Sequence, residues 1–317
     1  MSSRKLMLVF CVAAAALASA PAVADVLIAC SPGQYPAWAQ DVADKIAGTG
    51  KVQGDIDLFN IRTGTPTLPQ LQEYEAVMVF TDGGAQNTNL LGDNLADYCD
   101  GGGGVVQCTF SWNEVIPISG RWRSGGYSPL TYAGQNQMTR LTIGTRHLPN
   151  HPALADVVTF DGGSASFHNT GTYAPNAIKI ADWSNGMPLV AEMPGKNGGI
   201  IGLNFYPPSS DARTDFWEVS TDGDHLLANA VVYVSGGGVD CDLIKKFKVK
   251  CRNNKLKAIV KSNLPEGTQL TIVDNVQKTV VTTNAKGKAK LKKKGQTGMH
   301  LVSIKECPEF EQEVDCG

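Results

Sequence analysis

The residues best suited to chemistry begin with a cysteine that follows four glycines, in the stretch DGGGGVVQCTFSW over residues 100–112. Such a run could cradle a phosphate, present Cys108 as a nucleophile, or form a turn into a buried strand. Loops that bind phosphate lead from a strand through glycines into a helix, whose N-terminus faces the anion. Here the glycines follow a predicted helix, 90–99, and precede a predicted strand. This order indicates a helix-to-strand turn, and we expect no nucleotide or other cofactor.

A second group of polar residues, around residues 147–168, could serve a metal or hydrolytic site. It contains His147, His151, Asp161 and His168. The spacing matches no zinc motif, so we predict no metal. If His151, Asp161 and His168 converge in space, they could serve a hydrolase that acts on carbohydrate or another polymer. Otherwise they are structural.

A third group lies in the glycine-rich segment after Cys108 and contains Trp112, Arg121, Trp122 and Tyr127. Aromatic rings and arginines on a loop can stack on sugars or grip a partner. They can also simply cover the sheet. Both interpretations stay open from the sequence.

Apolar runs that alternate with helical stretches must position these residues. Strands are predicted at 26–29, 55–61, 76–80 and 105–110, and helices at 37–47, 68–74 and 90–99. Further strands are predicted at 157–160, 177–183, 189–193 and 199–205, before a closing helix at 224–234. The alternation predicts an α/β domain with a doubly wound, three-layer arrangement. Ligands of such sheets bind at the carboxyl ends of strands, in the loops after residues 29, 80, 110 and 205.

Several stretches of this domain are similar to one known superfamily. They are VMVFTDGG at 77–84, the strand that carries Cys108, His151-Pro152, IIGLNFYPPS at 200–209, and DGDHLLANA at 222–230. Over about residues 25–236 the chain resembles the class I glutamine amidotransferase-like superfamily, and within it the secreted or ThuA-like branch. The resemblance implies a flavodoxin-like layout, with Gly83 and Gly84 in the loop that forms the oxyanion pocket of amidotransferases.

The catalytic residues of active amidotransferases are not matched. The family's nucleophile lies in G-x-C-x-G, whereas Cys108 is flanked by Val106 and Phe110. Tyr206 and Pro208 stand where the family's G-x-x-F-H-P-E segment has His and Glu. A thiol without a base stays mostly protonated near neutral pH. We therefore predict that Cys108, Tyr206 and Pro208 are vestigial catalytic positions.

The candidate ligand-binding residues surround this vestigial pocket at the predicted ligand edge of the sheet. They are Gly83, Gly84, Trp112, Arg121, Trp122, Tyr127 and Tyr206.

The N-terminus has the three-part pattern of a secretory signal peptide. Arg4 and Lys5 precede an apolar stretch at 6–17, and the small residues of Ala22-Val23-Ala24 follow. We expect residues 1–24 to be a signal peptide and the protein to be secreted, into the periplasm or outside the cell. No later stretch has the length of a transmembrane helix, so we predict no transmembrane segment.

Charge divides the rest of the chain into two predicted domains, 25–236 and 237–317. Residues 25–239 hold 10 Lys or Arg and 21 Asp or Glu, whereas residues 240–317 hold 16 and 9. Strong period-two alternation in the basic part predicts a β-sandwich, and residues 283–289 resemble the strand-turn of bacterial Ig-like domains. Four cysteines predict two disulfides. For antiparallel first and last strands we expect Cys251–Cys307 and Cys241–Cys316.

The lysines of this second domain alternate with apolar residues along each predicted strand. A lysine face could bind a polyanionic envelope polymer, or it could be solvated lysine that protects strand edges. No nucleic-acid partner is expected. The sequence thus predicts a secreted, catalytically degenerate protein with a ligand-binding or structural role, and the hydrolase is the alternative. A third possibility is that the α/β domain only displays the basic domain.

Overall fold

The computed structural model describes residues 24–136, 138–236, 239, 241–264 and 268–317. The predicted signal peptide lies outside the described residues except for Ala24. Among the described helices, none is both long and apolar enough to span a membrane.

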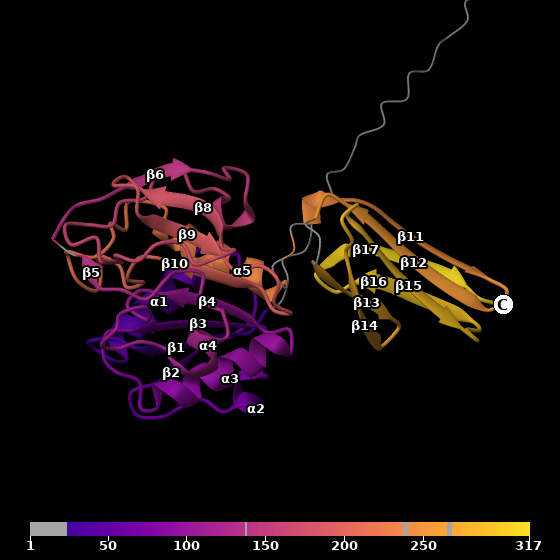
Figure 1. The fold of residues 1–317 in the computed structure, drawn as a ribbon, viewed down its shortest axis with the longest axis horizontal. Coiled ribbons are helices and arrows are strands. Elements are labelled where there is room, and N and C mark those ends of the chain that lie inside the picture. Colours follow the sequence, from indigo (N-terminus) through magenta and orange to yellow (C-terminus); the bar gives the residue numbers. More distant parts are fainter. Residues whose placement is uncertain (1–23, 137, 237–238, 240, 265–267) are drawn as a thin grey trace, which may run out of the picture.

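The N-terminal domain is built on one eight-stranded sheet with the order β2-β1-β3-β4-β10-β9-β8-β6 (Figure 1). Its first five strands are mutually parallel: β2 (Ile56–Asn60), β1 (Val26–Ser31), β3 (Ala76–Thr81), β4 (Gly104–Cys108) and β10 (Ile200–Leu203). Three strands extend the sheet in antiparallel pairing: β9 (Pro188–Glu192), β8 (Ile178–Trp183) and β6 (Ile143–Arg146). The short strands β5 (Gln135–Asn136) and β7 (His168–Asn169) pair with each other outside this sheet.

Helices cover both faces of this sheet, which confirms the predicted three-layer α/β domain. Along β1, Val26 and Ile28 belong to the hydrophobic cluster under α1 (Ala37–Gly48) and α5 (Gly223–Ser235). Leu27 and Ala29 belong to the opposite cluster, which packs against the remaining helices: α2 (Leu68–Leu71), α3 (Thr88–Asp100) and α4 (Gly120–Ser124). Successive strand side chains point to opposite faces, so a strand buried on both faces is apolar throughout.

One predicted strand is wrong, because residues 157–160 are irregular. The backbone amides of Val158 and Thr159 donate to Oδ2 of Asp222, at 2.8 and 2.7 Å. The carboxylate of Asp222 thus accepts the backbone hydrogen bonds that a neighbouring strand would otherwise accept. The short 3-10 helix η1 (Pro152–Leu154) precedes this segment.

The C-terminal domain consists of two antiparallel sheets packed around one core. The three-stranded sheet contains β11 (Ile244–Arg252), β12 (Lys255–Ser262) and β15 (Lys288–Lys294). The four-stranded sheet contains β14 (Gln277–Thr282), β13 (Gln269–Asp274), β16 (Met299–Ile304) and β17 (Cys307–Asp315). Phe247 and Leu256 of one sheet share a core with Ile272 and Val302 of the other. This arrangement confirms the predicted all-β sandwich.

The domain holds two disulfides, but their predicted pairing is wrong. The structure joins Cys241 to Cys307 and Cys251 to Cys316. Cys241 lies in the 3-10 helix η2 (Cys241–Leu243), just before β11, and Cys307 opens β17. Cys251 lies near the end of β11, and Cys316 follows β17 directly. The bonds therefore join start to start and end to end, because β11 and β17 run in the same direction and not antiparallel.

Candidate functional site

The loops after β1, β3 and β10 meet at the carboxyl edge of the parallel strands. The hydroxyl of Tyr206 donates a hydrogen bond to Oδ2 of Asp82, at 3.2 Å. Gly33 lies against the same carboxylate, since a Cβ at this position would be 2.8 Å from Asp82 Oδ2. Asp82 is exposed, whereas the ring of Tyr206 is buried. The edge thus carries an exposed carboxylate that is held by a buried phenol.

An arginine completes this arrangement on the solvent side. The Cζ atom of Arg213 lies 4.3, 5.5 and 5.6 Å from the ring centroids of Phe216, Phe167 and Trp38. Its Nη2 donates to Oδ2 of Asp215 at 2.7 Å. The ring of Tyr206 packs on Phe216 with a centroid distance of 4.9 Å.

We call Asp82, Tyr206, Arg213 and the three rings Trp38, Phe167 and Phe216 the edge cluster. It places exposed groups of both charge signs, Asp82 and Arg213, beside largely buried aromatic rings.

The chemistry of Tyr206 is limited by its surroundings. Burial and the nearby charge of Asp82 raise the pKa of Tyr206 far above its ordinary value. The phenol therefore stays protonated at physiological pH, so it acts as a hydrogen-bond donor and not as a base. Pro208, at the other vestigial position, is buried and offers no titratable group. Neither residue can activate a thiol.

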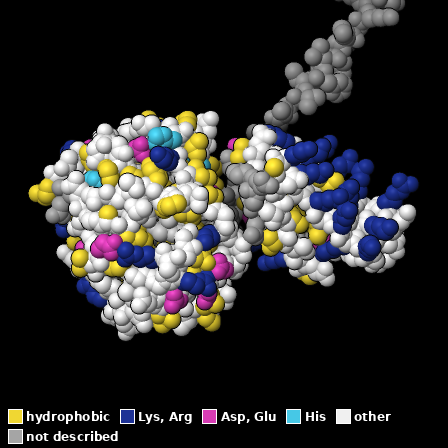
Figure 2. All heavy atoms as spheres, in the orientation of Figure 1, with side chains coloured by type: hydrophobic (Ala, Val, Ile, Leu, Met, Phe, Trp, Pro, Cys, Tyr) yellow, Lys and Arg dark blue, Asp and Glu magenta, His cyan; other side chains and the backbone are white. Residues whose placement is uncertain are grey.

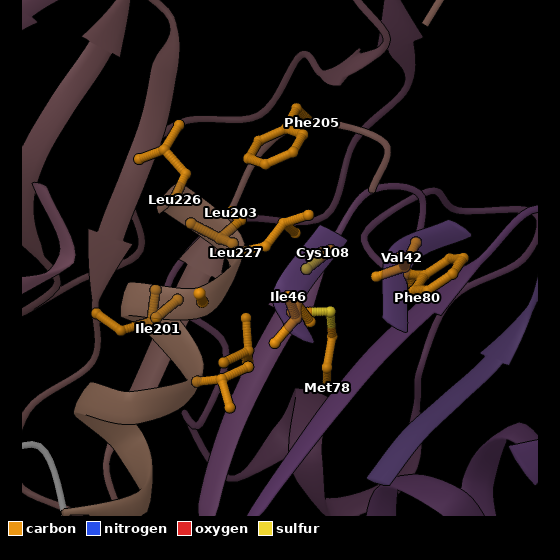
Figure 3. Close-up of a cluster of buried hydrophobic side chains, with 14 of the residues drawn as sticks. Val42, Ile46, Met78, Phe80, Cys108, Ile201, Leu203, Phe205, Leu226 and Leu227 are labelled. Atoms are coloured by element: carbon orange, nitrogen blue, oxygen red, sulfur yellow. The ribbon is translucent and has the colours of Figure 1, made fainter. Parts of the chain in front are cut away.

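Cys108 lies in the core of the domain and not at its surface. Its side chain is fully buried among apolar residues from β10 and α5, including Leu203 and Leu227 (Figure 3). Burial raises the pKa of the Cys108 thiol well above its ordinary value. A neutral, inaccessible thiol is not a nucleophile.

The glycine loop after β3 is arranged differently from an oxyanion pocket. The amide of Gly83 donates to the carbonyl oxygen of Ser31 at 3.0 Å, so this donor is already used. The guanidinium of Arg62 lies where a side chain at Gly83 would be, since Nη2 is 2.1 Å from the Cβ position. Gly84 is exposed, and nothing lies within 4 Å of a Cβ placed there. The loop therefore exposes Gly84, while Arg62, from the segment after β2, donates through Nη2 to the carbonyl oxygens of Ser31 and Pro32.

The segment after β4 covers the sheet. Trp112 and Trp122 are fully buried, and their indole nitrogens donate to Ser128 and Gln107. Tyr127 stacks on Trp122 with a centroid distance of 5.3 Å. The rings of Trp112, Trp122 and Tyr127 therefore cover the sheet and offer no surface to a ligand.

Arg121 belongs to the same surface of the domain, at α4. Its guanidinium pairs with Asp97 at 2.7 Å and also with Asp100. It donates to the hydroxyl of Tyr127 at 3.0 Å. This network fastens α4 to α3 and already engages the Arg121 guanidinium.

The histidine and aspartate candidates contact different partners. His151 Nε2 lies 3.3 Å from Glu192 Oε2, and Asp161 Oδ2 pairs with Arg140 Nε at 2.9 Å. His168 is buried, and its Nδ1 lies 2.7 Å from the carbonyl oxygen of Ser166. Burial lowers the pKa of His168. Across the residues that the structure describes, no hydrogen bond joins any two of these three side chains.

Only one group in the described part of the chain has the geometry of a possible metal site. It consists of Cys241, Cys307 and Glu309. The two cysteines form a disulfide, so their sulfurs cannot act as thiolate ligands.

Of the edge cluster, the sequence predicted Tyr206 but neither Asp82 nor Arg213. A signal was present, since residues 211–216 read Asp-Ala-Arg-Thr-Asp-Phe and follow the strand that ends near Phe205. Charged residues beside aromatic ones in a loop at the carboxyl edge are typical of a binding site.

Comparison with known proteins identifies the fold. No protein-family model and no curated protein matches the sequence. Among solved structures, the chain is similar to a protein from Parabacteroides merdae described as ThuA-like. The TM-score is 0.52 and the sequence identity 12%, and the match covers 71% of this chain and 94% of that one. The α/β domain therefore shares its fold with this ThuA-like protein.

Two further structures are similar at lower scores. One is a protein from Bacteroides uniformis described as ThuA-like, with a TM-score of 0.49, 15% identity, and coverage of 70% of this chain and 95% of that one. The other, from Thermoplasma acidophilum, is described as part of a GMP synthase, with a TM-score of 0.41, 9% identity, and coverage of 68% and 94%.

Proposed function

We propose that this chain is a secreted, non-catalytic protein that binds a carbohydrate at the edge cluster of its α/β domain. The observation that carries the proposal is the contrast between two places in one domain. The thiol of Cys108 is buried in the core without a base, whereas the side chains of Asp82 and Arg213 are exposed at the edge where ligands of such sheets bind.

The chemistry of the edge cluster fits a sugar. Sugar hydroxyls can donate to a carboxylate and accept from a guanidinium, and Asp82 and Arg213 supply one of each. The partly exposed ring of Phe167 provides an apolar surface beside them. Gly84, in the loop after β3, and Arg62, in the segment after β2, extend the same edge. No described contact among His151, Asp161 and His168 favours the alternative hydrolase.

Secretion and the class of the second domain are parts of the same proposal. The N-terminal pattern of residues 1–24 supports export, and two disulfides are typical of oxidising compartments. The local likeness of residues 283–289 supports an Ig-like class for the C-terminal sandwich. A polyanionic polymer, the other partner suggested by the sequence, would contact this domain and not the edge cluster.

The test is binding of the whole mature protein to a glycan array, followed by affinity measurement on the bound glycans with an Arg213→Ala variant. Loss of a charged hydrogen-bonding group should weaken binding about tenfold or more. Arg123→Ala is the matched control, because Arg123 pairs with Glu114 through two hydrogen bonds and lies 4.3 Å from the ring centroid of Tyr132. Equal affinities of the two variants, or no glycan bound at all, would overturn the proposal.

A further inference from the structure

The outer face of the three-stranded sheet carries a grid of positive charges. Strand register aligns outward-pointing residues into four rows across β11, β12 and β15. Row one is Lys246, Lys261 and Lys288; row two is Lys248, Ile259 and Lys290; row three is Lys250, Lys257 and Lys292; row four is Arg252, Lys255 and Lys294. Eleven of the twelve positions are cationic, and Figure 2 shows basic side chains gathered over this part of the domain.

No acid on the three strands themselves compensates this charge. The three strands contain no Asp or Glu. Within the described residues, none of the eleven cations forms an ion pair. Lys293, which pairs with Asp274 at 2.8 Å, is not one of them. Repulsion from Lys250 and Lys246 lowers the pKa of Lys248. The face therefore repels itself and attracts anions from solution.

Edge protection does not explain the grid. Lysine protects the edge strands of a sheet from pairing with other chains. However, Lys255, Lys257 and Lys261 lie on β12, the central strand, which is already paired on both sides. Each of the three faces a basic residue on both neighbouring strands, and like charges directly opposite each other destabilise a sheet. A cost of this kind in the folded protein indicates a function for the charge.

A recess lies at one end of the grid. All six residues of rows three and four line it, together with Leu256 and Lys293, and it has a volume of about 450 Å³. Neighbouring cations within a row are about 4.8 Å apart at their backbones, and the two rows are about 6.7 Å apart along the strands. Rows three and four thus form two parallel lines of charge that cross the three strands.

The composition of the face selects among polyanions. Ten of its eleven cations are lysines, which act as flexible point charges, whereas planar, bidentate recognition of a phosphate would favour arginine. The grid has no aromatic side chain on which bases could stack, as proteins that bind single-stranded nucleic acid provide. Its one apolar residue, Ile259, is not enough for insertion into a lipid surface. A linear chain with exposed, repeating anionic groups fits best.

We propose that rows three and four bind a linear acidic polysaccharide, which lies in the recess across β11, β12 and β15 with its carboxylate or sulfate groups between the two lines of cations. The polymer binds through charge and spacing, without recognition of individual sugars. This site is independent of the edge cluster and of the carbohydrate proposed to bind there.

The experiment measures binding of the whole mature protein to two immobilised probes, heparin and polygalacturonate, at several salt concentrations. The test variant replaces row three, as Lys250→Gln, Lys257→Gln and Lys292→Gln. The matched control replaces row one, as Lys246→Gln, Lys261→Gln and Lys288→Gln. Both remove three lysines from the same three strands, so they change the net charge equally.

The row-three variant should bind at least one probe about tenfold or more weakly, and the row-one variant should lose less than about threefold. Binding should weaken as the salt concentration rises, because the bound polyanion releases its counterions into solution. Equal losses in the two variants would overturn the site, since general charge attraction would then explain binding. Tighter binding to anionic lipid vesicles or to single-stranded DNA than to both polysaccharides would overturn the choice of ligand. Thermal unfolding of each variant checks that the fold is kept.

Discussion

The substitution Cys108→Ser tests whether the vestigial nucleophile position is a core position. The thiol is fully buried, and no hydrogen bond to its sulfur is present among the described residues. A serine hydroxyl buried there without a partner should cost about 1–3 kcal/mol of unfolding free energy at pH 7. Binding of a glycan at the edge cluster should not change, since Cys108 does not reach that surface.

The pH dependence of the unfolding free energy also distinguishes the wild type from this variant. Burial holds the pKa of Cys108 well above its ordinary value in the folded state, so the folded protein keeps this proton while the unfolded chain loses it above about pH 8.5. The stabilisation is thus fully present below pH 8.5 and is lost as pH rises. The wild type should lose about 1.4 kcal/mol per pH unit from this thiol, and the serine variant should not. The difference in unfolding free energy between the two proteins should therefore narrow by about 1.6 kcal/mol between pH 8.5 and 10.

Urea unfolding followed by tryptophan fluorescence measures this gap, because all five tryptophans lie in the α/β domain. Cys30 and Cys99 are also buried with raised pKa values, but they are present in both proteins and cancel in the difference. A difference in unfolding free energy that stays constant with pH would contradict a buried, protonated Cys108, since it would mean that the thiol is already ionised or exposed in the folded protein. So would rapid alkylation of Cys108 in the native state.

Two further predictions concern the two disulfides and the packing of the α/β domain. Peptide mapping should find Cys241 linked to Cys307 and Cys251 linked to Cys316, and linkage of Cys251 to Cys307 would contradict the structure. The two bonds close loops of similar length, with sequence separations of 66 and 65, so replacing either pair by alanine should lower the unfolding free energy by about 4 kcal/mol. Gly104→Ala should lower the unfolding free energy by about 1–3 kcal/mol, and with it the thermal unfolding midpoint, since its Cβ would lie 2.2 Å from the carbonyl oxygen of Val234. Gly84→Ala, in open space, should leave the midpoint unchanged, and equal midpoints of the two variants would contradict this packing.

Local patterns predicted the parallel half of the sheet well. A strand such as β3 is buried on both faces, so its apolar run is visible in the sequence without any partner. The irregular segment 157–160 is equally apolar at Val157 and Phe160, but its amides bond to Asp222, which lies more than 60 residues away. The composition of residues 157–160 alone therefore does not reveal that Asp222 is their hydrogen-bond partner.

The errors at the sites have the same cause. Period-two alternation fixes which face of a strand is buried but not the direction of strands in facing sheets, so the disulfide pairing was wrong. The edge cluster joins Trp38, Asp82, Phe167 and Arg213 from four loops or helices that only the folded chain brings together. The lysine grid was predicted as a face, because alternation is local, but its rows required the register between strands.

We propose that the α/β domain binds a carbohydrate at the edge cluster without acting on it. The most direct measurement is a glycan array probed with wild type, Arg213→Ala and Arg123→Ala, with the mass of each glycan determined on the array afterwards. Wild type and Arg123→Ala should be retained on the same glycans, Arg213→Ala should be lost from them, and every glycan should keep its mass. Cleaved glycans, or equal retention of the two arginine variants, would contradict this proposal.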